Sequence, residues 1–268
     1  MSTAARRDIL ISGVQFDREL RSGKISVLEL APIALRHGLA GVEYREVYWH
    51  DKATELPALR EQLARLGLKA VYATFNTLFS RDPEKQKLLV QDLEDAHALG
   101  APFMRVFRGE RPTASPADAS MRDAAKALVE RAASYGMRLA LENYSGIPGS
   151  RPEEILEALE ILDSPVVGVN IDFANFAGHG IDPIEAIERL APWIIYTHLK
   201  DHRPTADGKA VNSYLGSGNL PLPAILESLE ATGRNFPYCF EFLGEDDPEG
   251  SIAKSIAYLS GLGLGSRG

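Results

Sequence analysis

Residues 138–172 read RLALENYSGIPGSRPEEILEALEILDSPVVGVNID, and this stretch holds one complete repeat of a regular pattern. A run rich in β-forming residues at 138–143 is followed by a helical pattern at 152–162, whose apolar residues are spaced three and four apart. A second β-rich run follows at 166–172. The order strand, helix, strand predicts one unit of a βα repeat.

The same alternation occurs along the whole chain. Eight β-rich runs are predicted, at 9–16, 41–46, 69–75, 103–107, 138–143, 166–172, 194–200 and 238–242. Helical patterns lie between them, at 27–37, 52–66, 83–99, 117–135, 152–162, 183–190 and 222–232. A glycine follows the predicted end of five of these helices, at Gly38, Gly67, Gly100, Gly136 and Gly233. Because glycine commonly ends a helix, these positions support the predicted boundaries.

Eight βα units in 268 residues predict an α/β fold of one kind, a single (β/α)8 TIM barrel. The hydrophobic share of 45% and the charged share of 25% are those of an ordinary globular protein. No linker rich in proline, glycine or serine interrupts the chain, so residues 1–268 are predicted to form one domain. An open doubly wound sheet is disfavoured, because no G-x-G-x-x-G motif follows the first predicted strand.

Charge and cysteine content limit the partners and the location. The chain has 29 lysines and arginines against 37 aspartates and glutamates, and its formal charge of −8 disfavours a nucleic acid partner. Cys239 is the only cysteine, which excludes an intrachain disulfide and zinc sites made of several thiolates, and a reducing cytoplasm is the predicted location. No run of 18 apolar residues is present, so no membrane span is predicted. The oligomeric state stays open, with a homo-oligomer among the alternatives.

Four predicted strands end in residues that can bind a metal ion: Glu142, Asp172, His198 and Glu241. In a TIM barrel the C-terminal ends of the strands form the site. Burying four such groups is costly unless a shared partner neutralises them, and one divalent cation would satisfy all four. Three carboxylates and an imidazole favour Mn²⁺, with Mg²⁺, Co²⁺ or Zn²⁺ as alternatives. The competing interpretation is that each acid caps a helix or pairs with arginine or lysine.

With these residues, the phrase His198-Leu-Lys-Asp201 and the later Gly216-Ser-Gly218 make the chain resemble the sugar phosphate isomerase/epimerase family, the xylose-isomerase-like TIM barrels. The resemblance extends from the first predicted strand to the eighth. It implies one divalent metal ion held by the four strand-end side chains, and a small carbohydrate substrate bound through its oxygens. The endonuclease IV branch, with its trinuclear zinc cluster, fits less well, because Asn175 stands where that branch has a histidine.

Glu142 and Glu241 come from the fifth and eighth predicted strands and would approach a substrate from different sides. A metal chelated by a ketone oxygen and the neighbouring hydroxyl acts as a Lewis acid and stabilises the enediolate that forms when an α-proton leaves. One glutamate can take that proton and the other can return one. The predicted activity is a divalent-metal-dependent isomerase or epimerase of a small keto sugar or sugar derivative.

Lys200 lies two residues beyond His198 and is predicted to share its face of the strand, nearer the barrel mouth. There it could act in catalysis by stabilising an enolate, bind a carboxylate or phosphate, or pair with Asp201. The lysine keeps a second activity open, a metal-dependent lyase, either a dehydratase or a decarboxylase, acting on an oxo-sugar or oxo-sugar acid. A third interpretation, a barrel that binds sugar without converting it, leaves the acid pair unexplained.

Five further residues are predicted to contact the substrate: Glu43, Arg45, Arg108, Asn175 and Arg203. Glu43 and Arg45 share a face of the second predicted strand, and Arg108 follows the fourth. Arg108 or Arg203 could hold an acidic substrate group through two parallel hydrogen bonds. Pairing with helix acids is the alternative for each arginine. The sugar itself, and whether it is phosphorylated or carboxylated, stays open.

Overall fold

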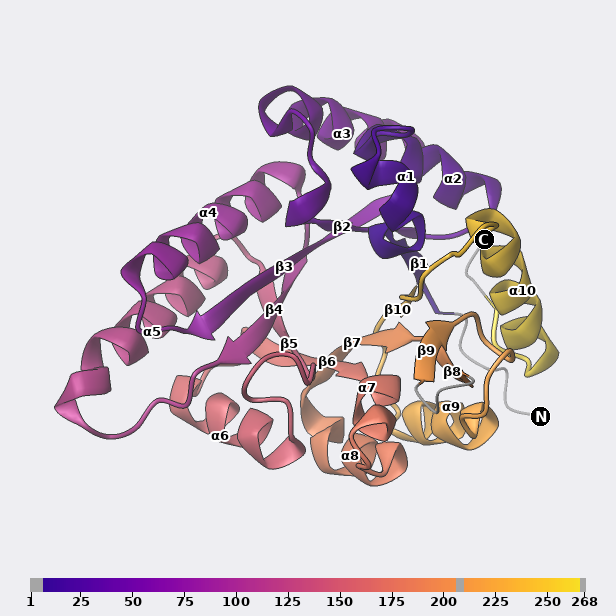
Figure 1. Ribbon diagram of the computed structural model, residues 1–268. Coiled ribbons are helices and arrows are strands. Elements are labelled where there is room, and N and C mark those ends of the chain that lie inside the picture. Colours follow the sequence, from indigo (N-terminus) through magenta and orange to yellow (C-terminus); the bar gives the residue numbers. More distant parts are fainter. Residues whose placement is uncertain (1–6, 206–209, 266–268) are drawn as a thin grey trace.

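The computed structural model describes residues 7–205 and 210–265, and within them eight parallel strands close into a barrel. Around the barrel the strands follow the order β1, β10, β7, β6, β5, β4, β3, β2. The helices lie outside this ring of strands (Figure 1). The architecture is the predicted (β/α)8 TIM barrel.

Each barrel strand lies at one of the predicted β-rich runs. The barrel strands are β1 (Ile9–Ser12), β2 (Gly41–Arg45), β3 (Lys69–Phe79), β4 (Phe103–Gly109), β5 (Arg138–Glu142), β6 (Val167–Asp172), β7 (Ile194–Leu199) and β10 (Tyr238–Phe240). The α-helices are α1 (Asp17–Arg21), α2 (Leu30–Arg36), α3 (Lys52–Leu66), α4 (Pro83–Leu99), α5 (Ala119–Ser134), α6 (Pro152–Leu162), α7 (Phe173–Gly178), α8 (Pro183–Leu190), α9 (Leu222–Ala231) and α10 (Pro248–Gly261). Helices α3, α4, α6 and α8 have the predicted bounds, whereas α1, α7 and α10 were not predicted.

Local sequence explains where the helices begin and end. A proline opens α4, and the Asp82 carboxylate before it accepts a hydrogen bond from the backbone N–H of Glu84 at 2.9 Å. Gly67 and Gly100 follow α3 and α4 with φ angles of 67° and 81°, which a glycine adopts without strain. Within the described part of the chain, no helix is both long and apolar enough to cross a membrane.

A two-stranded antiparallel hairpin, β8 (Asp201–Pro204) and β9 (Ala210–Ser213), follows β7 and was not predicted. Its first residue, Asp201, accepts hydrogen bonds from three backbone N–H groups, those of His202, Gly218 and Leu220, at 2.8, 2.8 and 3.1 Å. A Cβ atom at Gly218 would lie 2.1 Å from the carbonyl oxygen of His202, so only glycine fits there. Asp201 therefore organises the hairpin and the loop toward α9, whereas Lys200 pairs with other carboxylates.

Apolar side chains fill two regions. The larger cluster lies between strands and helices. The smaller cluster contains Leu10, Val71, Ala140, Tyr196 and Cys239, contributed by five different barrel strands, and therefore fills the interior of the barrel. Side chains two residues apart on a strand share a face, so Glu142 lies directly beyond Ala140 at the barrel mouth. The apolar cluster thus lies directly below the polar residues at the strand ends.

Candidate metal centre

The four predicted metal ligands end neighbouring strands of the barrel. Glu142 is the last residue of β5 and Asp172 the last of β6, while His198 lies in β7 and Glu241 directly follows β10. All four side chains are buried, and one ligand atom of each lies within 4.8 Å of the others. Four strands of the barrel thus bring their potential ligand atoms to one point.

The Nδ1 atom of His198 faces the three carboxylates of this group. It lies 3.3 Å from Oε1 of Glu142, 3.8 Å from Oδ2 of Asp172 and 3.9 Å from Oε2 of Glu241. The opposite ring nitrogen, Nε2, lies 2.7 Å from Oε2 of Glu43. Because a carboxylate only accepts, Nε2 is the donor in that bond, and Nδ1 is turned toward the other three residues.

Three cationic side chains pair with the carboxylates. The pairs join Lys200 to Asp172 and Glu241, Arg105 to Glu142, and Arg45 to Glu241. Nζ of Lys200 lies 2.5 Å from Oδ2 of Asp172 and 2.6 Å from Oε2 of Glu241. Such pairs are expected if the acids only pair with arginine or lysine and bind no metal ion. The convergence of the three carboxylates on the imidazole of His198 is an additional feature that pairing alone does not require.

Burial and charge shift the pKa values of this group. Burial by itself lowers the pKa of His198, but the neighbouring carboxylates, with Glu43 first, outweigh burial and raise the pKa to about 10. Burial raises the pKa of Asp172, and the nearby charge of Lys200 does not cancel this effect. A crowded carboxylate that is hard to ionise would gain from a further cation. Three buried carboxylates and one oriented imidazole are a donor set that fits a divalent ion.

A pocket of about 220 Å³ lies at the mouth of the barrel beside these residues. Its polar lining includes Arg45, Arg105, Glu142, Asn175, Lys200 and Glu241. Its apolar lining includes Phe75, Phe107 and Tyr144, whose rings contact one another. A pocket of this size, with charged groups on one part of its wall and aromatic rings on another, suits a small polar molecule.

The five predicted substrate contacts fall into different places. Arg45 and Asn175 line the pocket. Glu43 is not among the described residues that line it, because its carboxylate bonds to the ring of a metal-ligand candidate one layer deeper in the barrel. Arg203 lies in the β8 strand with 44% of its side chain exposed and is paired with Glu245.

Arg108 also lies away from the pocket. Its Nη1 atom is 3.5 Å from Oε1 of Glu154 in α6, outside the ring of strands. Arg105, three residues earlier in β4, lines the pocket instead, with its guanidinium carbon 4.6 Å from the centre of the Phe107 ring. The sequence contained a signal for this: from Phe103, which packs on the interior cluster, a period of two selects residues 105 and 107.

Curated relatives cover this chain to different extents. An uncharacterised protein of Methanocaldococcus jannaschii is 32% identical over 111 residues, which are 40% of this chain and 37% of that protein, so the chain matches little more than a third of this relative. The 3-dehydroshikimate dehydratase of Bacillus anthracis is 23% identical over 192 residues, 66% of this chain and 67% of the dehydratase. An inosose dehydratase of Clostridium botulinum is 22% identical over 252 residues, 82% of each chain.

Solved structures share the fold over almost the whole chain. The IolI protein with a bound zinc atom superposes with a TM-score of 0.77 at 17% identity, covering 95% of this chain and 97% of that one. A D-tagatose 3-epimerase-like protein superposes with a TM-score of 0.73 at 23% identity, covering 95% and 98%. At these identities the likeness shows a common fold.

The family model described as xylose isomerase-like TIM barrel matches residues 32–262. This range contains the four converging ligand candidates and all but one of the described residues that line the pocket, Val14 being outside it. The match confirms the resemblance read from the strand-end residues. The chain therefore belongs to the xylose isomerase-like TIM barrel family.

Proposed function

We propose that this protein is a divalent-metal-dependent isomerase or epimerase of a small keto sugar or sugar derivative. The observation that carries the proposal is the convergence of Glu142, Asp172, His198 and Glu241 beside a pocket of about 220 Å³. These four side chains would hold the ion. When bound, a divalent cation supplies Lewis acidity, which polarises a substrate carbonyl and makes the neighbouring C–H bond more acidic.

Glu142 and Glu241 are suited to move the proton. Strands β6 and β7 separate β5 from β10 around the barrel, so the two carboxylates enter the pocket from different sides. Burial raises the pKa of Glu241, but the opposite charges of Lys200, His198 and Arg45 outweigh burial and lower it. Glu241 is therefore ionised at neutral pH, which is the form that a proton acceptor requires, although the same charges weaken it as a base. A carboxyl on the other side would return the proton.

A second candidate activity is a lyase reaction on an oxo-sugar acid, and the charge of the site favours it. Four buried carboxylates, those of Glu43, Glu142, Asp172 and Glu241, face three cationic side chains, those of Arg45, Arg105 and Lys200. A divalent ion held by Nδ1 would displace the second proton of the imidazole, and with the imidazole neutral the site would carry one net positive charge. Such a site attracts an anionic substrate. Two of the relatives are dehydratases, which agrees with this candidate.

The experiment incubates the protein with Mg²⁺ or Mn²⁺ in D₂O, with keto sugars and with oxo-sugar acids of matched length. The metal is removed before ¹H NMR spectra are recorded. Deuterium at the α-carbon together with a new epimer or isomer supports the first activity, whereas loss of water or CO₂ supports the second. Turnover that persists unchanged in chelator, or in Glu241→Gln, would contradict both.

A further inference from the structure

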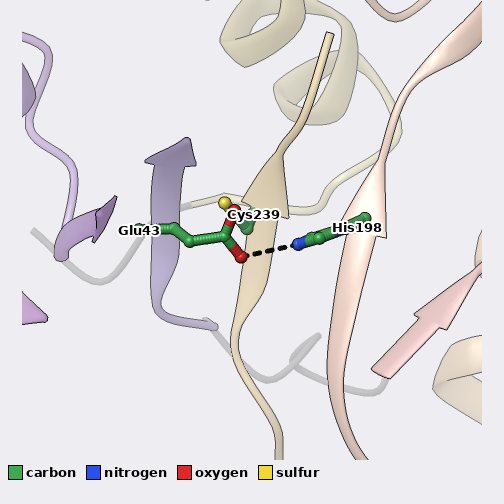
Figure 2. Close-up of side chains that lie close together, drawn as sticks. All are labelled: Glu43, His198 and Cys239. Carbon is green, nitrogen blue, oxygen red and sulfur yellow. Dashed lines mark hydrogen bonds and ion pairs between the residues drawn. The ribbon is translucent and has the colours of Figure 1, made fainter. Parts of the chain in front are cut away.

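Glu43 occupies a position that neither ligand binding nor substrate contact explains. It lies in the middle of β2, fully buried, one layer deeper in the barrel than Arg45. In Figure 2 its carboxylate extends across the barrel interior to the ring of His198. The substrate pocket is lined by Arg45 on the same face of the strand, so a substrate there meets Arg45 before it can reach Glu43.

Both carboxylate oxygens of Glu43 are engaged. Oε2 accepts the bond from Nε2 of His198 at 2.7 Å, and Oε1 accepts one from the hydroxyl of Ser12 at 2.8 Å. Ser12 ends the neighbouring strand β1 and is the register partner of Glu43. The Nε atom of Arg45 lies 3.6 Å from Oε1 and adds a charge on the same side. These contacts hold the carboxylate in one orientation.

The bond to Nε2 helps to orient the imidazole, whose other nitrogen, Nδ1, also lies 3.2 Å from Nδ2 of Asn170. Nδ1 faces the oxygens of Glu142, Asp172 and Glu241 at 3.3 to 3.9 Å. The ring of Tyr196 packs edge-on against the imidazole, with centroids 5.3 Å apart and an interplanar angle of 72°, which restricts tilting of the imidazole. A histidine that ligates a metal commonly depends on such a carboxylate on its other nitrogen to fix its tautomer and its direction.

We infer that Glu43 is a positioning residue of the metal centre, which holds His198 so that Nδ1 points at the three carboxylates, and that Ser12 holds Glu43 in turn. The inference rests on the proposed metal site. It differs from a second ion site among Glu43, His198 and Cys239, which also lie close together (Figure 2). The 2.7 Å between carboxylate and imidazole is a hydrogen-bond length, whereas two ligands of one tetrahedral zinc ion lie roughly 3.4 Å apart.

The test measures Mn²⁺ binding to the purified chain by titration calorimetry. Glu43→Leu removes the carboxylate that accepts the Nε2 proton, and we expect Mn²⁺ affinity to fall about 10- to 100-fold. Glu43→Gln keeps an amide oxygen that can accept the same bond, so it should recover most of the affinity. The matched control is Cys239→Ala, which removes a neighbouring buried side chain whose thiol contacts the carbonyl oxygen of Phe240, and it should bind Mn²⁺ like the parent.

A folded Glu43→Leu that binds Mn²⁺ as tightly as the parent would overturn the inference. Equal losses in Glu43→Leu and Glu43→Gln would also overturn it, because the hydrogen bond would then not be the cause, and so would an equal loss in Cys239→Ala. If Glu43→Leu fails to fold, Ser12→Ala tests the inference instead. A several-fold weaker Mn²⁺ affinity would support the chain of contacts from Ser12 through Glu43 to His198, and an unchanged affinity would contradict it.

A second readout needs no metal. In ¹⁵N-histidine NMR spectra, the Nε2 proton of His198 should exchange slowly in the parent and in Glu43→Gln, and rapidly in Glu43→Leu. Rapid exchange in the parent would contradict the inference. If the parent shows slow exchange but binds no Mn²⁺, the proposed metal function fails while the contact between Glu43 and His198 stands, so the two failures can be told apart.

Discussion

The Nζ atom of Lys200 lies 2.5 Å from Oδ2 of Asp172, and the same ammonium group lies 2.6 Å from Oε2 of Glu241. The lysine is 2% exposed and lines the pocket at the barrel mouth. Burial lowers the pKa of Lys200, but these two carboxylates outweigh burial and raise it, so the side chain is charged at neutral pH. A positive charge that contacts two ligand candidates therefore also lines the pocket.

Lys200→Met is expected to lower kcat roughly 10²-fold with a smaller change in KM, because the ammonium group stabilises charge that develops in the transition state. A rise in KM with kcat unchanged would instead assign Lys200 to binding a remote anionic group. Steady-state kinetics on the substrate found by NMR measure both constants. The control is Lys52→Met, which breaks an ion pair of 2.7 Å with Asp95 outside the pocket. Unaltered constants in Lys200→Met would remove it from the site.

Glu142→Gln and Glu241→Gln should each reduce turnover by about 10²-fold or more, because each change keeps the shape and one coordinating oxygen but removes the base. Metal content, measured by elemental analysis of the same samples, separates loss of the proton carrier from loss of the ion. The matched control is Glu249→Gln, a surface residue paired with Arg36. Near-native turnover of Glu142→Gln with metal bound would show that Glu142 does not carry the proton.

Metal removal should lower the melting temperature. The purified protein is expected to carry about one divalent ion per chain after mild dialysis, and an ion at 100 times its Kd would stabilise the folded state by about 2.7 kcal/mol. Differential scanning calorimetry with and without EDTA tests this. His198→Asn should abolish most of the difference, because it removes the only imidazole among the four converging ligand candidates. The same melting temperature under both conditions would count against the metal site.

Arg105 and Arg108 should behave differently although both are buried in β4. Arg105→Met is expected to raise KM for a carboxylated substrate about tenfold or more, because its guanidinium lines the pocket. Arg108→Met should leave KM unchanged and cost about 1–3 kcal/mol of unfolding free energy, because it removes packing and a contact with Glu154. Kinetics and urea denaturation of both variants measure the contrast. Equal effects of the two substitutions on KM would contradict the assignment of Arg105 to the pocket face of β4 and of Arg108 to the opposite face.

The stability of the metal-free protein should depend on pH through the Glu43–His198 pair. The pKa of His198 is raised to about 10, so its contribution is complete below its unfolded value of about 6.5 and is lost as the pH rises toward 10. Burial raises the pKa of Glu43, but His198 and the nearby arginines lower it to about 2, so its contribution is complete above about 4.3 and is lost as the pH falls toward 2.

The combined contribution of Glu43 and His198 to the unfolding free energy should be greatest between about pH 4.3 and pH 6.5. Urea denaturation of EDTA-treated protein across the pH range measures the profile. In His198→Asn the decline on the alkaline side should become smaller, because the titrating imidazole is gone. An identical alkaline decline in that variant would show that other groups cause it.

The barrel and the set of converging side chains could be predicted from local features of the sequence. Runs with a period of two or 3.6 residues are local properties of the chain, and so are the glycines and prolines that bound the helices. Once the strands are placed in a parallel barrel, their C-terminal ends must meet, which is why Glu142, Asp172, His198 and Glu241 could be predicted as a group.

The partners of the charged side chains depend on contacts between distant parts of the chain and could not be predicted from local patterns. Glu43 and His198 are 155 residues apart, and their contact depends on barrel closure, strand register and the depth of each residue. Arg105 and Arg108 differ only in the face of β4 on which they lie, and a shift of one residue in a strand reverses that face. Lys200 pairs with Asp172 and Glu241 rather than with the adjacent Asp201. Side chains of adjacent strand residues point to opposite faces, so Asp201 bonds to the backbone of Gly218, while closure of the barrel brings Asp172 and Glu241 to Lys200.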